Sequence, residues 1–541
     1  MCKRLGQEER APWKPSWHHG SVPGGNGKSK PASPVNRFLT SPPLNGPLVP
    51  ASVRLGLVLL VVLIRVPSFF EPRWYSDEGF FTTVAWVTAR GVPLYSGIYD
   101  NQPPVIFWLY RVTQALGSLE HHYVVQLTAT AAVALVALFT FEVSRRLVGQ
   151  WPSTLAAALT GAALSLPVLD GDLLNVELAA LPFFLAALLL AFSTRSALVL
   201  ASGALLGLAI ATRPSFALDA FALAIPLLSS DHRLRRLCLT ACGVMLTGVL
   251  VTGALASQGS LAPYLAVVLP ADHAYLVWSN GGSLLPLIVR LGALATVAVI
   301  GLRQATKSDA RLAVVWLAAA LAGAGLTPRE LTHYSHEAIP PLAFAVALLV
   351  ARVRRRWLAV VPAALAVIVG AEAALIIPAL ETALLTGRTP PPPLLHNFSY
   401  ERLPAYYSNW LDLVFVRESA AAYANDFPDS PALDRSEAFF LKSQPGAADS
   451  RLIVLGDRPW LYVDTGMLPG SRYIATNSAF WRVPSAAADM TRALNDSCAS
   501  FVVYTTGPGN WQPALDSGGY VPMPDAPMPT YRSTRLGVGC G

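Results

Sequence analysis

Long apolar stretches recur along the chain from residue 53 to about residue 380, and short polar segments separate them. A helix needs about 20 apolar residues to cross the hydrocarbon core of a bilayer, which is about 30 Å thick. The pattern therefore predicts an α-helical polytopic membrane protein with about eleven transmembrane helices, several of them short. The expected spans are 53–70, 122–142, 152–168, 177–193, 197–212, 215–230, 237–256, 284–301, 312–326, 337–351 and 357–380.

Two segments depart from this pattern. Residues 1–50 are rich in Pro, Gly, Ser and Lys without apolar periodicity, which predicts a disordered cytoplasmic tail. After the proline run 390–393, β-rich runs alternate with helix-like stretches such as 486–495, which predicts a small extracytoplasmic α/β domain. The β-rich runs are 451–456, 472–475, 501–505 and 531–536. We therefore expect a transmembrane domain over 51–385 and an α/β domain over 386–541.

The charged residues agree with a membrane protein. Only 13% of the residues are charged, about half the share of an ordinary globular domain. The formal net charge is +7, but the basic residues crowd the N-terminal tail and the ends of apolar runs. In those places they act as topology signals, and we expect no nucleic-acid partner. The positive-inside rule holds if the N-terminus is cytoplasmic, which predicts a multi-pass protein of the plasma (inner) membrane.

The same alternation predicts which segments lie outside. They include the loop after the first span, the loop 257–283 and everything after about residue 381. The apolar stretch 103–117 must not cross the membrane, because a crossing there would break the alternation. We expect it to form a helix in the outer interface, since Pro103 and Pro104 suit a helix N-terminus.

The five cysteines form no CxxC motif and no Cys/His cluster, so a structural zinc site is not expected. Cys238 and Cys242 lie one helical turn apart in an apolar run and are interpreted as inert packing residues. Cys498 and Cys540 lie in the polar C-terminal region. Outside the cytoplasm these two can form a disulfide, and the sequence leaves open whether they do.

Two adjacent acids, Asp77 and Glu78, follow the first predicted span. One interpretation is a solvated pair at a helix N-terminus, where Ser76, Asp77 and Glu78 provide good capping chemistry. The other is a catalytic carboxylate at the outer mouth of the bilayer. The aromatic residues around the pair and the polar string 99–104 favour the second interpretation, because sugar sites typically combine carboxylates with aromatic rings.

A second outer loop gathers Asp170, Asp172, Asn175 and Glu177, with no basic residue among them. It is either a polar turn between helices or a rim that binds an acceptor or a metal ion. Carboxylate and amide oxygens suit hard divalent cations, although no spacing here is diagnostic. A divalent cation is the only cofactor that the sequence suggests.

A few basic and aromatic groups also lie on the predicted outer side. Arg213 ends an apolar run, and His333 and Tyr334 follow Arg329 in a later loop. Arg213 is either a ligand or a side chain that extends from a helix end towards water. His333 and the nearby His336 belong either to a wet loop or to the site. As ligands, these groups would bind a phosphate at the outer leaflet.

Several of these segments together resemble a known family. Tyr75-Ser76-Asp77-Glu78-Gly79 and Asp100-Asn101-Gln102-Pro103-Pro104 resemble the first periplasmic loop of GT-C fold glycosyltransferases. The most similar group is the protein-mannosyltransferase and aminoarabinose-transferase-like one (glycosyltransferase family 39/83-like). The match is dense over 74–117 and looser to about residue 350. The looser matches are Asn175-x-Glu177, Ala211-Thr212-Arg213 and His333-Tyr334 ahead of Pro340-Pro341.

This resemblance implies a GT-C fold and assigns roles to residues. Asp77 corresponds to the catalytic base or acceptor-site carboxylate, and Glu78 supports it. Gln102 stands where many relatives carry a phosphate-binding lysine, which shifts that contact to Arg213, Arg329 or a metal ion. The implied donor- and phosphate-binding set is Arg213, His333, Tyr334, Gln102 and Arg329. The implied acceptor or rim set is Tyr75, Asp100, Asn101, Asp172, Asn175 and Glu177.

The implied activity is transfer of a hexosyl or pentosyl group from a polyprenyl-phosphate donor to an extracytoplasmic glycan, lipid or protein. Phosphate leaves without a general acid, so one carboxylate suffices to deprotonate the acceptor hydroxyl for in-line attack with inversion. Two alternatives stay open: a transporter or flippase for a lipid-linked sugar with an outer sensor domain, and a non-catalytic assembly protein. Transport sites usually place charges near the bilayer midplane, whereas these acids cluster in loops.

Overall fold

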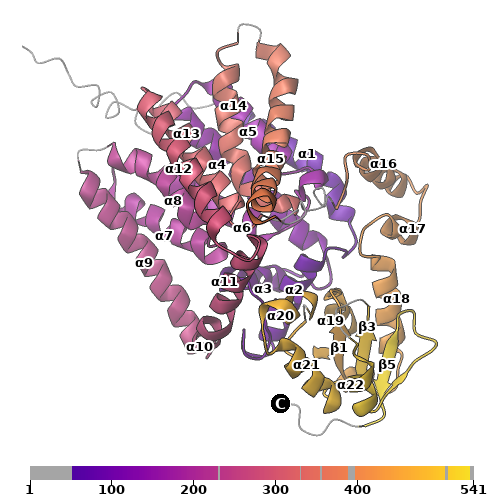
Figure 1. Cartoon of the computed structure of the whole chain (residues 1–541). Coiled ribbons are helices and arrows are strands. Elements are labelled where there is room, and N and C mark those ends of the chain that lie inside the picture. Colours follow the sequence, from indigo (N-terminus) through magenta and orange to yellow (C-terminus); the bar gives the residue numbers. More distant parts are fainter. Residues whose placement is uncertain are drawn as a thin grey trace, which may run out of the picture. The chain divides into compact units, whose positions relative to one another are not determined.

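The computed structural model describes residues 51–535, apart from 230–231, 329–330, 354–355, 388–396, 475 and 506–509. The predicted tail over 1–50 lies outside the described residues, as do Arg329 and Cys540. We refer to residues 51–386 as the helical region and to residues 397–535 as the C-terminal region. Figure 1 shows both, coloured along the sequence.

The helical region is built from apolar helices, in which every interior backbone group finds its partner within the helix. In chain order they are α1 (Ala51–Arg65), α2 (Ser76–Thr88), α3 (Pro104–Ala115), α4 (Tyr123–Arg145), α5 (Gln150–Ala163), α6 (Val176–Leu190), α7 (Ser196–Thr212), α8 (Phe216–Leu228), α9 (Arg233–Ser257), α10 (Leu261–Pro263), α11 (Leu269–Ser279), α12 (Leu285–Gln304), α13 (Ser308–Ala324), α14 (Ile339–Val350) and α15 (Val360–Thr386). Shorter helical turns connect them: η2 (Val66–Phe70), η3 (Pro167–Leu169), η4 (Tyr264–Val268), η5 (Thr332–Ala338) and η6 (Arg356–Ala359).

Six helical stretches in the described part of the chain are long and apolar enough to cross a membrane. They are Ala51–Phe70, Tyr123–Arg145, Arg233–Ser257, Leu261–Ser279, Leu285–Gln304 and Trp357–Thr386. The apolar helices α6, α7 and α8 are shorter. The predicted class, a polytopic α-helical membrane protein, is therefore confirmed, while the expected number of spans stays a prediction.

Two expectations about the helical region are wrong. Residues 257–283, expected to be a loop, include the continuous helical stretch Leu261–Ser279. Polar residues such as Asp272 and His273 interrupt its apolar run, which hid the helix from the hydropathy pattern. Cys238 and Cys242, expected to be packing residues, are free and exposed on α9.

Helices α7 and α9 meet at glycines. A Cβ atom at Gly203 in α7 would collide with the backbone of Thr240, and one at Gly243 in α9 would collide with the backbone of Leu200. The two backbones therefore lie in direct contact. Small residues permit this close approach between membrane helices, where dispersion contacts hold helices together.

The C-terminal region combines helices with one mixed sheet. Its helices are α16 (Leu403–Val414), α17 (Ala420–Asn425), α18 (Pro431–Lys442), α19 (Trp460–Thr465), α20 (Thr476–Arg482), α21 (Ala486–Asn495) and α22 (Gln512–Ser517), with the turn η7 (Ala447–Asp449). Its strands are β1 (Arg451–Leu455), β2 (Leu468–Pro469), β3 (Phe501–Tyr504), β4 (Tyr520–Pro522) and β5 (Thr530–Ser533). The strand order is β2-β1-β3-β5-β4, with β1 parallel to β2 and β3, and with β5 antiparallel to β3 and β4.

The predicted α/β character of this region is confirmed, and α21 has the expected bounds. The run 472–475 forms no strand among its described residues. Instead, Tyr473 makes a single bridge with Tyr99 of the helical region. Cys498 forms a disulfide, and Cys540, with which the sequence leaves a pairing open, lies outside the described residues.

The C-terminal region contacts the start of α2 and the loop that follows this helix (Figure 1). Trp460 in α19 donates a hydrogen bond from Nε1 to the carbonyl of Tyr75 (2.9 Å). The amide of Tyr99 donates to the carbonyl of Arg472 (2.8 Å). These contacts fix the position of α2, which carries the two acids singled out in the sequence.

We expect Gly243→Ala to destabilise the protein, because the added methyl group collides with the α7 backbone. Overpacking of this kind costs about 1–3 kcal/mol. Thermal unfolding of the detergent-purified protein measures the effect. Gly248→Ala is the matched control on the same helix, since a Cβ atom there meets no other atom within 4 Å. Equal unfolding temperatures for the two variants would contradict the close crossing.

Candidate active site

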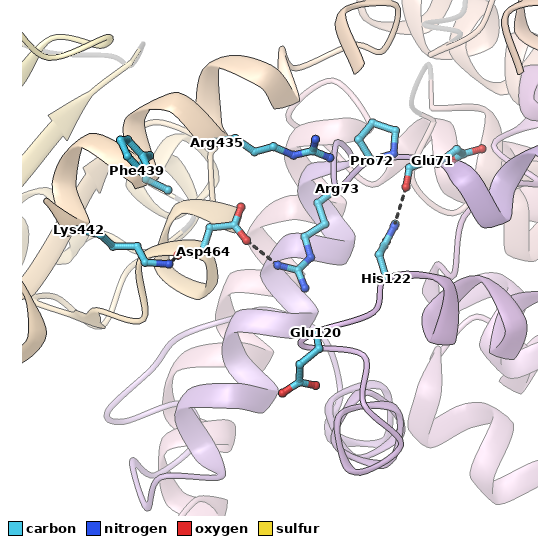
Figure 2. A pocket seen from close by; sticks show the side chains of 10 residues that line it. Glu71, Pro72, Arg73, Glu120, His122, Arg435, Phe439, Lys442 and Asp464 are labelled. Carbon is cyan, nitrogen blue, oxygen red and sulfur yellow. Dashed lines mark hydrogen bonds and ion pairs between the residues drawn. The ribbon is translucent and has the colours of Figure 1, made fainter. Parts of the chain in front are cut away.

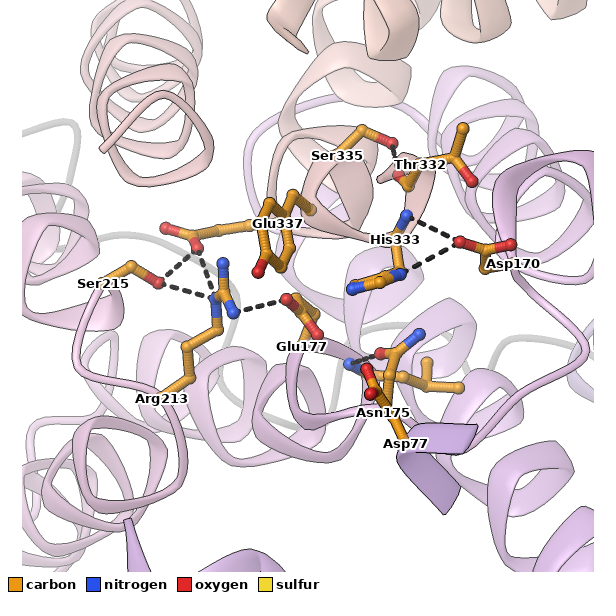
Figure 3. Close-up of polar contacts among 12 residues, drawn as sticks. Asp77, Asp170, Asn175, Glu177, Arg213, Ser215, Thr332, His333, Ser335 and Glu337 are labelled. Atoms are coloured by element: carbon orange, nitrogen blue, oxygen red, sulfur yellow. Dashed lines mark hydrogen bonds and ion pairs between the residues drawn. The ribbon is translucent and has the colours of Figure 1, made fainter. Parts of the chain in front are cut away.

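The candidate site lies where the first turn of α2 meets the start of α6, the end of α7 and the turn η5 (Figure 3). Tyr75 is the N-cap residue of α2, and no side-chain hydrogen bond caps this helix. Glu78 is buried, with 1% of its surface exposed. The interpretation of Asp77 and Glu78 as a solvated capping pair therefore does not describe the structure.

A chain of polar contacts links Asp77 to η5. The hydroxyl of Tyr75 donates to Asp77 Oδ2 (3.2 Å) and lies 3.4 Å from Nδ1 of His333. His333 Nδ1 in turn donates to Asp170 Oδ2 (3.0 Å). Asn397 of the C-terminal region donates from Nδ2 to Asp170 Oδ1 (2.8 Å). Both oxygens of Asp170 thus accept hydrogen bonds, and the Asp77 carboxylate lies at the other end of this series of contacts.

The pKa values of Asp77, Asp170 and His333 are shifted in different ways, which indicates different roles. Burial raises the pKa of Asp77, and the charge of His333 and the Tyr75 hydrogen bond only partly oppose it. Burial also raises the pKa of Asp170, but its hydrogen bond and ion pair with His333 outweigh this effect and leave the pKa below the usual value. Burial lowers the pKa of His333, but Glu177 and Asp170 outweigh it and leave the pKa above the usual value. His333 and Asp170 therefore form a charged pair, while Asp77 is a carboxylate of increased basicity.

Arg213 forms the centre of a second cluster (Figure 3). It forms an ion pair with Glu177, and its Nε lies 3.9 Å from Glu337 Oε2. Nε also donates to Ser215 Oγ (3.1 Å), whose hydroxyl donates to Glu337 Oε2 (2.6 Å). The guanidinium lies 4.8 Å from the ring centre of Tyr334. The two neighbouring carboxylates already compensate the charge of Arg213.

Glu78 and Asn175 hold the loop between η3 and α6 in place. Glu78 Oε1 accepts a hydrogen bond from the amide of Leu174 (2.7 Å), and Oε2 accepts one from His122 Nε2 (3.1 Å). Asn175 Oδ1 caps α6 by accepting from the amide of Leu178 (2.9 Å). Both residues therefore position the loop through these bonds, and the catalytic role expected of Glu78 stays a prediction.

Asp172, Asp100 and the neighbouring His336 have hydrogen-bond partners of their own. Asp172 is buried, and its carbonyl accepts a hydrogen bond from Arg65 (3.0 Å). Asp100 Oδ1 accepts from the amide of Gln102 (2.9 Å), which closes the turn after Tyr99. His336, which lies beside His333 in η5, donates from Nε2 to the carbonyl of Leu169 (2.6 Å). Burial lowers the pKa of His336 to about 4, so it is a neutral structural residue.

Comparison with known proteins supports the fold. Residues 101–257 match the family model of dolichyl-phosphate-mannose-protein mannosyltransferases. No curated protein is significantly similar in sequence. The crystal structure of ArnT from Cupriavidus metallidurans bound to undecaprenyl phosphate aligns over 89% of this chain and 98% of its own, with 16% identity and a TM-score of 0.53. The apo structure of ArnT aligns over 89% and 97%, with 15% identity and a TM-score of 0.51.

The chain has a GT-C fold. The predicted fold class and the predicted resemblance to the protein-mannosyltransferase and aminoarabinose-transferase-like group are confirmed. A further GT-C structure, the oligosaccharyltransferase AglB from Archaeoglobus fulgidus, aligns over 84% of this chain and 69% of its own, with 13% identity and a TM-score of 0.42.

A cavity of about 440 Å³ lies between the helical region and α18 (Figure 2). It is next to the pair formed by Glu78 and His122. Its charged lining residues include Glu71, Arg73, His122, Arg435, Lys442 and Asp464. Arg73 pairs with Asp464 (2.5 Å), which ties this wall of the helical region to α19. Because His122 lines the cavity and also bonds to Glu78, this cavity adjoins the α2 helix that carries Asp77.

No group of three or more His, Cys, Asp and Glu side chains within the described ranges is arranged to hold a metal ion. Two carboxylates of the site are already paired with cations, Asp170 with His333 and Glu177 with Arg213. The divalent cation suggested by the sequence stays a prediction. The proposed reaction uses only amino-acid side chains of this protein.

We expect Glu78→Ala to destabilise the protein by about 2–4 kcal/mol, because it leaves the buried Leu174 amide and His122 without their acceptor. Glu78→Gln should recover part of this loss, since its amide oxygen still accepts one bond. Thermal unfolding measures both variants. The exposed Glu120 serves as the control position. A Glu78→Ala protein as stable as the Glu120→Ala protein would show that the two bonds contribute nothing.

Proposed function

We propose that this protein is a membrane glycosyltransferase that moves a sugar from a polyprenyl-phosphate donor to an acceptor outside the cytoplasm, with inversion. The observation that carries the proposal is the Asp77 carboxylate, whose pKa is raised and which lies in one polar array with His333. Two further findings support a lipid-phosphate donor: the ArnT structure contains undecaprenyl phosphate, and the description of the matching family names dolichyl phosphate mannose.

In the proposed reaction, Asp77 removes the proton from the acceptor hydroxyl. The acceptor oxygen forms a bond to the anomeric carbon while the bond from that carbon to the phosphate oxygen breaks. The electron pair leaves with the polyprenyl phosphate, which needs no proton donor because phosphate is a good leaving group. The Tyr75 hydroxyl binds Asp77 Oδ2 and thereby orients the carboxylate. Asp170 keeps His333 charged beside it.

The described arrangement also supports the proposed topology. The site lies at the end of the helical region that contacts the C-terminal region, through bonds such as Trp460 to Tyr75 and Asn397 to Asp170. The arginine-rich segments at 145–146, 233–236 and 352–356 belong to the cytoplasmic side under the positive-inside rule. We therefore place the site and the predicted α/β domain (386–541) outside, and the tail (1–50) in the cytoplasm.

We expect Asp77→Asn to lower sugar transfer by about a hundredfold to ten-thousandfold, the usual contribution of a general base. The assay follows release of free polyprenyl phosphate from a radiolabelled lipid-linked sugar in membranes that contain the full-length protein. Asp516→Asn, at an exposed position in α22, is the control and should retain full activity.

The same assay separates the proposed enzyme from a flippase. An enzyme cleaves the lipid-linked sugar, whereas a flippase moves it between leaflets intact. Movement of the labelled lipid without release of polyprenyl phosphate by the wild-type protein would contradict the proposed function. Full transfer by a folded Asp77→Asn protein would contradict the assignment of the base but not the reaction.

The pH dependence tests the environment of Asp77. A base is lost as the pH falls through its pKa, and burial places that pKa above the ordinary value of about 3.9. The charge of His333 lowers the pKa of Asp77, so His333→Gln should raise it further and move the acid limb of kcat/KM to higher pH. His121→Gln, at an exposed histidine, should leave the limb in place. A shift to lower pH in His333→Gln would contradict this electrostatic coupling.

A further inference from the structure

Within the described ranges, which leave out Arg329, the two cations predicted to bind the donor phosphate each have a carboxylate partner. Arg213 is paired with Glu177 and contacts Glu337, and Gln102 is neutral. His333 is paired with Asp170. A phosphate that approaches the Asp77 carboxylate is repelled by it, and a further positive charge close by would offset this repulsion.

The C-terminal region brings such a charge to the same place. Arg482 is the last residue of α20, and its guanidinium lies 4.2 Å from the ring centre of Tyr275 in α11. The hydroxyls of Tyr275 and Tyr334 are hydrogen-bonded (3.1 Å). Because the guanidinium of Arg213 lies against the ring of Tyr334, two linked tyrosines connect the two arginines.

The segment before α20 is attached to the loop that holds Gln102. The amide of Tyr99 donates to the carbonyl of Arg472 (2.8 Å), and the rings of Tyr99 and Tyr473 pack at 5.5 Å. This attachment sets α20 beside the loop 99–102. The bond to Arg472 thus anchors the segment before α20, and the ring of Tyr275 contacts Arg482 at the end of this helix.

The charge of Arg482 acts on the acidic side of the site. Burial raises the pKa of Asp77, and the Arg482 charge is one of the influences that oppose this rise. The same holds for Asp100, where burial raises the pKa to about 6 and Arg482 lowers it. Arg482 therefore lies close enough to both carboxylates to affect them, although it comes from a different region of the chain.

We propose that Arg482 binds the phosphate of the lipid-linked donor and supplies the positive charge that Gln102 lacks. This inference rests on the proposed function, because it assumes a polyprenyl-phosphate donor. A guanidinium suits the role, since its planar N–H groups bind two phosphate oxygens at once and it stacks on aromatic rings. On this proposal the C-terminal region contributes a ligand directly, so the donor site is complete only when this region is seated on the helical region.

The test compares two probes with the same hydrocarbon chain, undecaprenyl phosphate and undecaprenol, in binding to the full-length protein in nanodiscs. Arg482→Gln should weaken undecaprenyl phosphate binding by about tenfold to a hundredfold, the effect of one lost charge-assisted hydrogen bond. Its affinity for undecaprenol should not change. Arg482→Lys keeps the charge and should recover part of the phosphate affinity. Arg492→Gln removes an arginine of α21 whose side chain is 70% exposed and should bind both lipids as the wild type does.

Two results would overturn the assignment of Arg482 and leave the proposed function standing. One is wild-type affinity of Arg482→Gln for undecaprenyl phosphate. The other is an equal loss of affinity for both lipids, which would indicate a structural role. If the wild-type protein itself showed no preference for the phosphate over the alcohol, the lipid-phosphate donor would fail, and the role of Arg482 would fail with it.

Discussion

A charged side chain that leaves water costs several kcal/mol unless an opposite charge or hydrogen bonds replace the lost water. This requirement determines which elements meet at the candidate site. His333 in η5 is paired with Asp170 before α6, and Arg213 at the end of α7 is paired with Glu177 in α6. Because the partners are far apart in sequence, the pairs join three separate connections at one end of the helical region. Asp77 lies among them, and burial keeps its pKa above the usual value because the charge of His333 and the Tyr75 hydrogen bond oppose that rise only in part.

The sequence allowed part of this site to be predicted. Polar residues between apolar runs are easy to recognise in a sequence, and Asp77, Arg213 and His333 stand out in this way. Whether a polar residue faces the site depends on its direction, which local sequence does not contain. Asp77 and Glu78 are adjacent, but successive residues of a helix point about 100° apart. Only one of them can face His333, and Glu78 instead bonds to Leu174 and His122.

The same distinction applies to the fold: local sequence predicts the elements, but it does not predict which distant segments contact each other. Apolar length predicted the polytopic helical class, and alternation of short runs predicted the α/β character of the C-terminal region. The pairing of Tyr473 was not predictable, because its partner Tyr99 lies in the helical region. Arg482 likewise belongs to no distinctive motif, because it lies between aromatic and small apolar residues. Its proximity to Tyr275 appears only when α20 is seated on the helical region.

The three consecutive residues Asp77, Glu78 and Gly79 each have a different role, and each role depends on contacts with distant segments of the chain. Asp77 is the proposed base, and Glu78 holds a neighbouring loop. Gly79 has a third role, which is to permit close packing against α19. A Cβ atom at Gly79 would lie 2.6 Å from Cγ of Pro459 and 3.0 Å from Cδ1 of Trp460. Any side chain would therefore push α19 away from α2 and disturb the bond from Trp460 to the Tyr75 carbonyl. Since Tyr75 also orients Asp77, the packing of the C-terminal region and the geometry of the proposed base depend on the same glycine.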